Sequence, residues 1–79
     1  MENKFEVLYW RGNIRFADDK DTFLGAVKFI NFLDSYGGYA DEIRHKGLPI
    51  YRRRIDEENG SDYWINENGK VVNLEQERR

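Results

Sequence analysis

A single stretch, residues 22–36, has a clear helical period, and the rest of the chain has to fold around it. At about 100° per residue, its apolar side chains gather on one arc, which comprises Phe23, Ala26, Val27, Phe29, Ile30 and Leu33. An arc of this width is typical of a helix that lies on a sheet. Asp19, Asp21 or Thr22 can cap the start of the helix, and Gly37-Gly38 can end it in the left-handed conformation.

Two apolar residues of this stretch, Leu24 and Phe32, fall outside the arc. Either a small sheet curls around the helix and covers them, or they contact a partner. Because single exposed apolar side chains are common on protein surfaces, the pattern favours partial cover by the sheet.

The segment before the helix predicts a β-hairpin. Residues 4–11 and 14–17 read as strands, and Gly12-Asn13 supplies a two-residue turn in which glycine can take positive φ. Trp10 and Arg15 then face each other as a cation–π pair on the surface away from the helix. Residues 18–21 are expected to form the loop into the helix. The opposite, helix-facing set is Phe5, Val7, Tyr9, Ile14 and Phe16.

After the helix, the alternation and turn signals predict strands over 39–45, 48–55 and 62–66, with turns at Lys46-Gly47 and Asn68-Gly69. The predicted fold is therefore α+β. It is an antiparallel sheet of about five to six strands in the order ββαββββ, with one helix packed across one face.

Three details of register follow from these turns. Two-residue turns would pair Ile43 with Ile50, and would pair Ile65 with Val72. Pro49 lacks an amide donor and indicates an edge or a bulge. A bulge within the arginine run after Ile50 would bring Ile55 to the same face as Ile50.

Length and composition limit the class of protein. The 79 residues predict one domain spanning 1–79, with 75–79 as a frayed, charged tail. There is no cysteine, which excludes disulfides, thiolate nucleophiles and cysteine-based zinc sites. No apolar run approaches membrane-spanning length and the start lacks a signal-peptide pattern, so a soluble cytoplasmic protein without a membrane partner is expected.

No recognisable catalytic or metal-binding pattern occurs. His45 is the only histidine, and it lies beside a turn between two cationic residues. The acidic loop that starts at Asp56 has its glycine at the wrong position for a calcium loop and is flanked by strands. An enzyme is therefore not expected, and no cofactor or metal is predicted.

The charge pattern is more informative than the net charge of −2. Arginines cluster just before an acidic loop, and aromatic residues lie nearby in the predicted sheet. Such a surface can bind another protein or, as the alternative, stack and clamp single-stranded nucleic acid. The arginines can equally pair internally with Asp41, Glu42 or Asp62. The predicted binding residues are Trp10, Arg44, Tyr51, Arg52, Arg53, Arg54, Asp56, Glu57, Glu58 and Trp64.

The layout of an N-terminal hairpin over 4–16, one helix and tight hairpins at Lys46-Gly47 and Asn68-Gly69 resembles the small accessory proteins of phages and mobile elements. Some of these proteins, including anti-CRISPR proteins, are stoichiometric inhibitors. The resemblance implies a non-catalytic, viral protein that binds and blocks a host or defence protein in the host cytoplasm. The sequence also predicts a homodimer through an exposed edge near residues 49–55.

Overall fold

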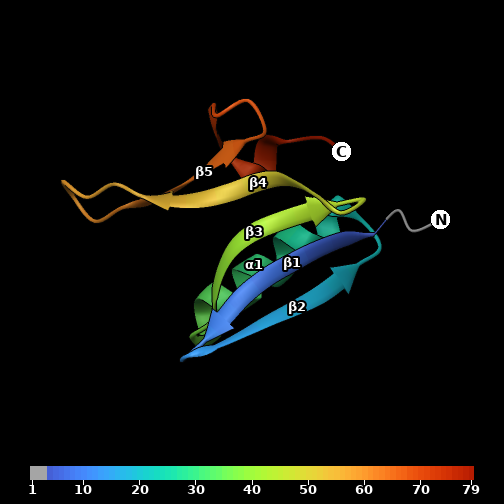
Figure 1. Cartoon of the computed structure of the whole chain (residues 1–79), viewed down its shortest axis with the longest axis horizontal. Coiled ribbons are helices and arrows are strands. Elements are labelled where there is room, and N and C mark those ends of the chain that lie inside the picture. Colours follow the sequence, from blue (N-terminus) through green and yellow to red (C-terminus); the bar gives the residue numbers. More distant parts are fainter. Residues whose placement is uncertain (1–3) are drawn as a thin grey trace.

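The computed structural model describes residues 4–79 as one six-stranded antiparallel sheet with one helix across it (Figure 1). The predicted α+β class and the order ββαββββ are confirmed. The elements are β1 (Phe5–Arg11), β2 (Ile14–Lys20), α1 (Phe23–Tyr36), β3 (Tyr39–His45), β4 (Leu48–Ile55), β5 (Asp62–Asn66), β6 (Val71–Val72) and a short 3₁₀ helix, η1 (Leu74–Gln76).

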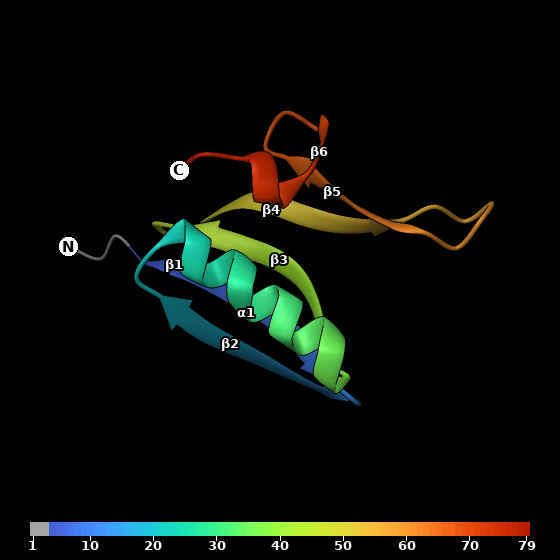
Figure 2. The ribbon, with the colours of Figure 1, turned by 180° about the vertical axis from the view of Figure 1, so that it is seen from behind.

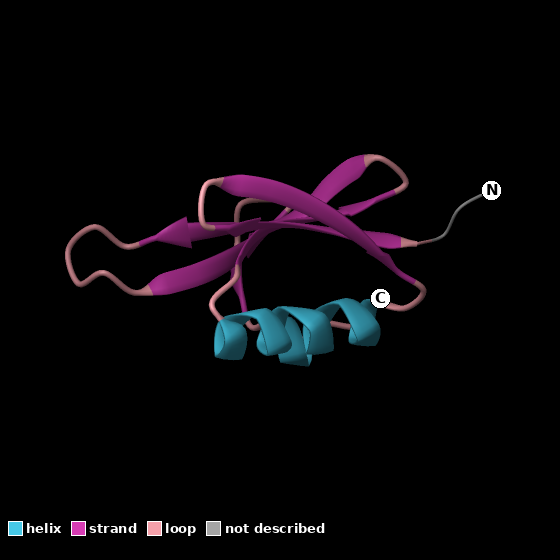
Figure 3. Ribbon diagram, turned by 90° about the horizontal axis from the view of Figure 1, so that it is seen from below, coloured by secondary structure: helices cyan, strands magenta, loops and turns pink. Residues whose placement is uncertain are grey.

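The strands lie in the order β2-β1-β3-β4-β5-β6, so β2 and the short β6 form the two edges of the sheet. The predicted edge near residues 49–55 is therefore wrong, because these residues belong to β4, which pairs with β3 and with β5. All of the strand pairs are antiparallel. Figure 3 shows α1 on one side of the curved sheet, and no helix of the described residues on the other side. We call the uncovered side the open face.

The ends of α1 are set by local hydrogen bonds, as predicted. The Thr22 side chain accepts from the Gly25 amide at 2.9 Å, which satisfies a free donor of the first turn. Gly37 has φ 92° and takes the left-handed position that ends the helix. The prediction of a loop over 18–21 is wrong for residues 18–20, because β2 continues to Lys20, which pairs with Phe5.

The core lies between α1 and the central strands, and the predicted arc of α1 faces it. Val7, Ile43 and Tyr51 contribute the largest fully buried side chains from the sheet. Burial of these apolar surfaces supplies the main stabilisation of a domain this small. The helix residues in the core are Phe23, Ala26, Val27, Ile30 and Leu33, with Phe29 partly buried against them.

The sheet divides where β3 meets β4. A bulge places Asp41 out of register with β1, and β3 pairs with β4 only from Glu42 onward. Beyond that point β4 and β5 continue as a two-stranded ribbon that projects past the rest of the sheet (Figures 1 and 2). We call this ribbon and its tip, residues 53–63, the arm, and the divergence of β3 from β4 the fork.

The predicted register of β3 and β4 needs a correction. Tyr51, not Ile50, lies opposite Ile43, because the register shifts by one residue next to Pro49. Ile50 is the extra, bulged residue, and both Ile50 and Tyr51 are buried. The bulge therefore precedes the arginine run. From Tyr51 onward the pairing with β5 is regular, which leaves Ile55 exposed.

The last hairpin also differs by one residue. Ile65 lies opposite Val71, not Val72, because the loop has three residues. The Asn66 side chain accepts from the Lys70 amide at 3.0 Å, and Gly69 adopts φ 80°. A left-handed glycine is typical of a three-residue hairpin loop.

The tail over 75–79 contacts the sheet, whereas the sequence predicted fraying. Leu74 is buried in the core and begins η1. The Tyr51 hydroxyl donates to Glu77 Oε1 at 2.6 Å, and Arg79 Nη2 donates to Glu67 Oε1 at 2.6 Å. A single apolar anchor followed by these polar contacts holds the chain end on β4.

Candidate functional site: an exposed aromatic surface

The predicted binding residue Arg53 points toward the helix side and fills the fork. Its Nη1 donates to Asp34 Oδ1 of α1 at 3.2 Å, and Nη2 lies 3.5 Å from Asp62 Oδ2 of β5. Its guanidinium carbon is 5.5 Å from the centre of the Trp64 ring. With only 12% of its side chain exposed, Arg53 ties the helix, β4 and β5 together.

Two predicted surface aromatics are also turned inward. Tyr51 is fully buried, and burial raises the pKa of its hydroxyl, as does its hydrogen bond to Glu77. Trp64 is half-buried and packs against the core. Trp64 shares a face with Val72 because the three-residue loop shifts β6 by one position. Both aromatics stabilise the fold; Tyr51 offers no binding surface, and Trp64 offers only its exposed part.

Three other predicted arginines lie on the open face. Glu42 of β3 accepts a hydrogen bond from Arg44 and lies 4.0 Å from Arg52 Nε, which directly opposes it in β4. The hydrogen bond from Arg44 to Glu42 raises the pKa of that guanidinium. Arg54 is exposed opposite Tyr63. The sequence left open whether the arginines pair with acids inside the chain; Arg44 and Arg52 do so, both with Glu42.

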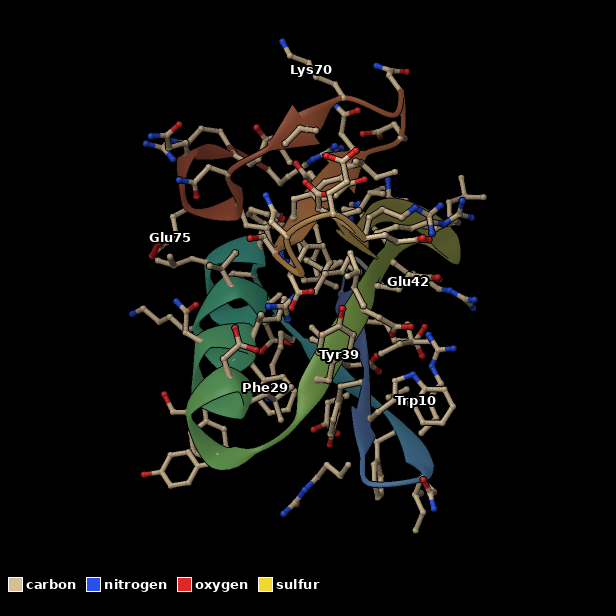
Figure 4. The ribbon with its side chains drawn as sticks, turned by 90° about the vertical axis from the view of Figure 1, so that its left-hand side faces the viewer. Trp10, Phe29, Tyr39, Glu42, Lys70 and Glu75 are labelled. Atoms are coloured by element: carbon tan, nitrogen blue, oxygen red, sulfur yellow. The ribbon has the colours of Figure 1, made fainter. Side chains whose placement is uncertain are left out.

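Trp10 also lies on the open face, as predicted. Figure 4 shows Trp10 and Glu42 on the side of the sheet opposite Phe29 and the helix. The Arg15 guanidinium lies 5.4 Å from the Trp10 ring centre, which confirms the predicted cation–π pair. Arg15 also donates to Asp41 at 2.9 Å. These contacts cover part of the Trp10 ring.

The acidic residues of the predicted site lie at the tip of the arm. Asp56 organises this loop: its amide donates to Ser61 at 2.7 Å and its side chain accepts from the Glu58 amide at 3.0 Å. Glu57 and Glu58 are exposed. Within residues 4–79, no group of three or more acidic or histidine side chains is arranged to hold a metal ion.

The most prominent surface was not among the predicted binding residues. Four large apolar side chains are exposed at the end of the molecule that holds the C-terminus of α1. The exposed fractions are 61% for Ile14, 40% for Phe16, 53% for Phe32 and 72% for Tyr36. We call these four residues the aromatic surface.

Stacked and edge-to-face rings connect this surface to the core. Phe16 stacks on Tyr9 at 5.5 Å between ring centres, and Tyr9 meets Phe29 edge-on at 5.3 Å. Phe29 lies 6.3 Å from Phe32, which lies 4.6 Å from Tyr36. Such ring pairs contribute beyond simple burial. The exposed rings are therefore held in place by buried ones.

Polar groups surround the aromatic surface. The Tyr9 hydroxyl donates to Asp18 at 3.1 Å, and burial, together with this hydrogen bond, raises the pKa of Tyr9. Lys20 Nζ lies 4.1 Å from the Phe29 ring centre. A hollow of about 250 Å³ opens beside the helix end, lined by Tyr9, Arg11, Phe29, Phe32, Leu33, Tyr36 and Gly38.

The sequence could identify only part of this surface. It singled out Phe32, together with Leu24, as lying outside the helical arc, and both are exposed, so cover by a curled sheet is wrong. It placed Ile14 and Phe16 on the sheet face that meets the helix; Phe16 does lie on that face, stacked on Tyr9, but the helix leaves both side chains exposed. The helix lies mainly over β1 and β3, so the outer strand β2 extends beyond its cover (Figure 2). The alternation of residues along β2 indicates which side chains lie on the helix side of the sheet, but it does not indicate whether the helix is wide enough to cover them.

A larger groove of about 640 Å³ runs between the first half of α1 and the tail, and Phe23, Leu24, Leu74 and Arg78 line part of it. His45 stacks on Phe5 at 4.3 Å and thus packs against the core. Across residues 4–79, no helix has the length and apolar character needed to cross a membrane.

Comparison of the chain with protein-family models, with curated proteins and with solved structures gives no match.

Proposed function

We propose that this chain is a non-catalytic protein-binding domain that contacts its partner through the aromatic surface. The observation that carries this proposal is the clustering of Ile14, Phe16, Phe32 and Tyr36, all at least 40% exposed, at one end of the fold. Isolated exposed apolar residues are ordinary, but a contiguous aromatic cluster with a polar rim is typical of a protein interface.

The rigidity of the rings supports this role. Phe32 and Phe16 are each stacked on a partly or fully buried ring, so little side-chain freedom is lost when a partner covers them. Binding hot spots are enriched in such fixed aromatic anchors. The narrower form of the proposal is a stoichiometric inhibitor that covers a functional surface of its partner, in the manner of the phage accessory proteins that the layout resembles.

The experiment compares affinity capture by the wild-type chain with capture by two variants, using extract from the source organism and quantitative mass spectrometry. Phe32→Ser combined with Tyr36→Ser removes half of the aromatic surface. Leu24→Ser removes a similarly exposed apolar side chain from the same helix and is the matched control. We expect a protein captured at one-to-one stoichiometry by the wild type and by the control, and lost from the double variant.

The captured protein is then added to the ¹⁵N-labelled chain. We expect the amide signals of Phe16, Phe32 and Tyr36 to shift or broaden most. Equal capture by both variants, or shifts confined to the arm or the open face, would remove the aromatic surface as the contact site.

Binding of single-stranded nucleic acid is the weaker alternative. Exposed Arg54 opposite Tyr63 favours it, whereas the pairing of Arg44 and Arg52 with Glu42 reduces the positive charge available to phosphate. This alternative predicts oligonucleotide binding that weakens steeply with salt. The absence of binding to a poly-dT oligonucleotide at low salt would exclude it.

A further inference from the structure

We propose that β2 pairs edge to edge with β2 of a second copy of this chain, antiparallel and around a two-fold axis at Ala17. β2 is a full-length edge of the sheet, seven residues from Ile14 to Lys20, and no strand within residues 4–79 pairs with its outer side. An unpaired edge of this length is a template for another strand. This inference rests on the edge of β2 and not on the partner protein proposed above, and Phe16 of the aromatic surface takes part in both contacts.

The hairpin geometry determines which backbone groups of β2 face outward. Arg11 and Ile14 close a two-residue turn, and this closing pair exchanges hydrogen bonds between the two strands. Alternate residues of β2 therefore direct their amide and carbonyl groups toward β1. The amides and carbonyls of the residues between them, Arg15, Ala17 and Asp19, point away from β1 and are free to pair with another strand.

A two-fold axis at Ala17 makes use of all three outward residues. Ala17 pairs with Ala17 of the second copy, and Arg15 pairs with Asp19 of that copy on each side of the axis. Opposite charges that face each other across antiparallel strands stabilise the pairing. Asp19 is exposed, while Arg15 is held in place by Asp41 and by the Trp10 ring. The charge pattern of β2 is thus complementary to itself.

Other registers with both helices on the same side are less favourable. Moving the axis to Asp18 places two aspartates directly opposite each other, which is a repulsive arrangement. Moving it to Phe16 places Arg15 opposite Ala17 and leaves Asp19 without its cationic partner. Only the axis at Ala17 pairs every outward residue of β2 with a complementary one.

The helix side of the same pairing adds an aromatic contact. Phe16 then lies diagonal to Phe16 of the second copy, a separation that aromatic side chains can bridge. The two exposed Phe16 rings thus approach each other across the axis. Because paired strands alone bury less area than a tightly bound dimer requires, we expect dimerisation to depend on protein concentration.

Cysteine cross-linking tests the register directly, because the native chain contains no cysteine. In the Ala17→Cys variant the two Cα atoms would be about 5.5 Å apart, within the range of a disulfide. In the Asp19→Cys variant the two cysteines would be about 14 Å apart along the strands, at about 3.4 Å per residue. We expect mild oxidation to link the Ala17→Cys variant at least about tenfold faster than the Asp19→Cys variant. Equal rates, or faster linkage of the Asp19→Cys variant, would overturn the proposed axis.

Analytical ultracentrifugation over a concentration series provides the second test. We expect a monomer–dimer equilibrium in the wild type, and an increase of about tenfold in its dissociation constant for Asp19→Arg, because the symmetry doubles the repulsion with Arg15. Combining Asp19→Arg with Arg15→Asp should restore dimerisation. A wild-type chain that stays monomeric up to millimolar concentration, or a double variant no better than the single one, would overturn the proposal.

Ala17→Pro removes an outward amide while leaving the β1–β2 hydrogen bonds intact, since proline is tolerated at edge positions whose amide faces away from the sheet. We expect this variant to be a folded monomer by circular dichroism and ultracentrifugation. A folded dimer with unchanged affinity would place the interface elsewhere.

Discussion

The two ends of α1 carry similar aromatic residues in opposite environments. At the N-terminal end, Phe23 is only 5% exposed, because Phe5, Tyr51 and the tail after β6 surround it. At the C-terminal end, Phe32 and Tyr36 are more than half exposed. We call these the closed end and the open end.

The difference shows that cover, not residue type, decides which rings join the core. The C-terminal residues of the chain cover the closed end, where Leu74 is buried and Glu77 and Arg79 form hydrogen bonds with the Tyr51 hydroxyl. Nothing among residues 4–79 covers the open end in the same way. The open end is therefore the part of this fold that a second molecule can complete.

The largest effect is expected from Phe23→Ala at the closed end. Removing this buried ring should lower the free energy of unfolding by about 3–5 kcal/mol through lost burial and a cavity. Phe32→Ala at the open end should cost less than about 1 kcal/mol, because the ring is already half in water. Urea denaturation followed by tryptophan fluorescence measures both. Equal losses would contradict the difference in burial between Phe23 and Phe32.

The second largest effect is expected at the ion pairs of Arg53, which hold the C-terminal half of α1 against β4 and β5. Arg53→Ala should destabilise the fold by about 2 kcal/mol, because Asp34 loses its charged hydrogen-bond donor and Asp62 loses its ion-pair partner. Arg54→Ala, one position along the same strand on the exposed side, should change stability by less than about 0.5 kcal/mol. Thermal denaturation of the matched pair checks this. A larger loss for Arg54→Ala would contradict the inward placement of Arg53.

A smaller effect is expected where the tail binds the closed end. Tyr51→Phe keeps the buried ring but removes the hydroxyl shared by Glu77 and Arg79, and should cost about 1 kcal/mol. Hydrogen exchange should accelerate at the amides of residues 76 and 77, which bond within the tail. Tyr63→Phe is the control, since its side chain lies on the open face. Unchanged exchange in Tyr51→Phe would show that Leu74 alone holds the tail.

The smallest effect is a loss of stability in alkali at both ends. Burial raises the pKa values of Tyr9 and Tyr51, with hydrogen bonds to Asp18 and Glu77 adding to the shift. The folded state therefore favours the protonated phenols. The unfolded chain ionises at its ordinary tyrosine pKa of 10.0, so stability should fall as the pH rises through 10.0 toward the higher folded values.

Denaturation at a series of pH values from 8 to 11 checks the alkaline prediction. Tyr9→Phe and Tyr51→Phe should each flatten the loss of stability with pH relative to the wild type. A slope that both variants share with the wild type would assign the alkaline loss to other groups.

The sequence predicted what short-range interactions decide. Thr22 and Gly37 each act through a hydrogen bond or a backbone angle within a few residues, so both ends of α1 were correct. Gly12-Asn13 and Lys46-Gly47 likewise set two hairpins whose turn residues were identified in advance. Strong local signals and the alternation of apolar residues were enough to define the α+β fold.

The remaining errors arise where tertiary geometry decides. Alternation correctly separated Arg53 from its neighbours, but the bulge at Ile50 determines which of the two faces meets the helix. The Asn66 side chain favours a three-residue loop over the expected two, which places Val72 instead of Asn73 opposite Trp64. Trp64 itself faces inward because it lies opposite Arg53 of β4. The exposure of Phe16 depends on where α1 crosses the sheet, and no short sequence pattern reports that position.

The fork has a practical consequence for engineering. Because the arm leaves the sheet after the last core residue of β4, its tip at residues 56–61 is separated from the apolar interior. Exposed hairpin tips of this kind are the positions where insertions are best tolerated. A foreign peptide epitope grafted between Glu58 and Asn59 would be displayed on a stalk, with the parent scaffold left undisturbed.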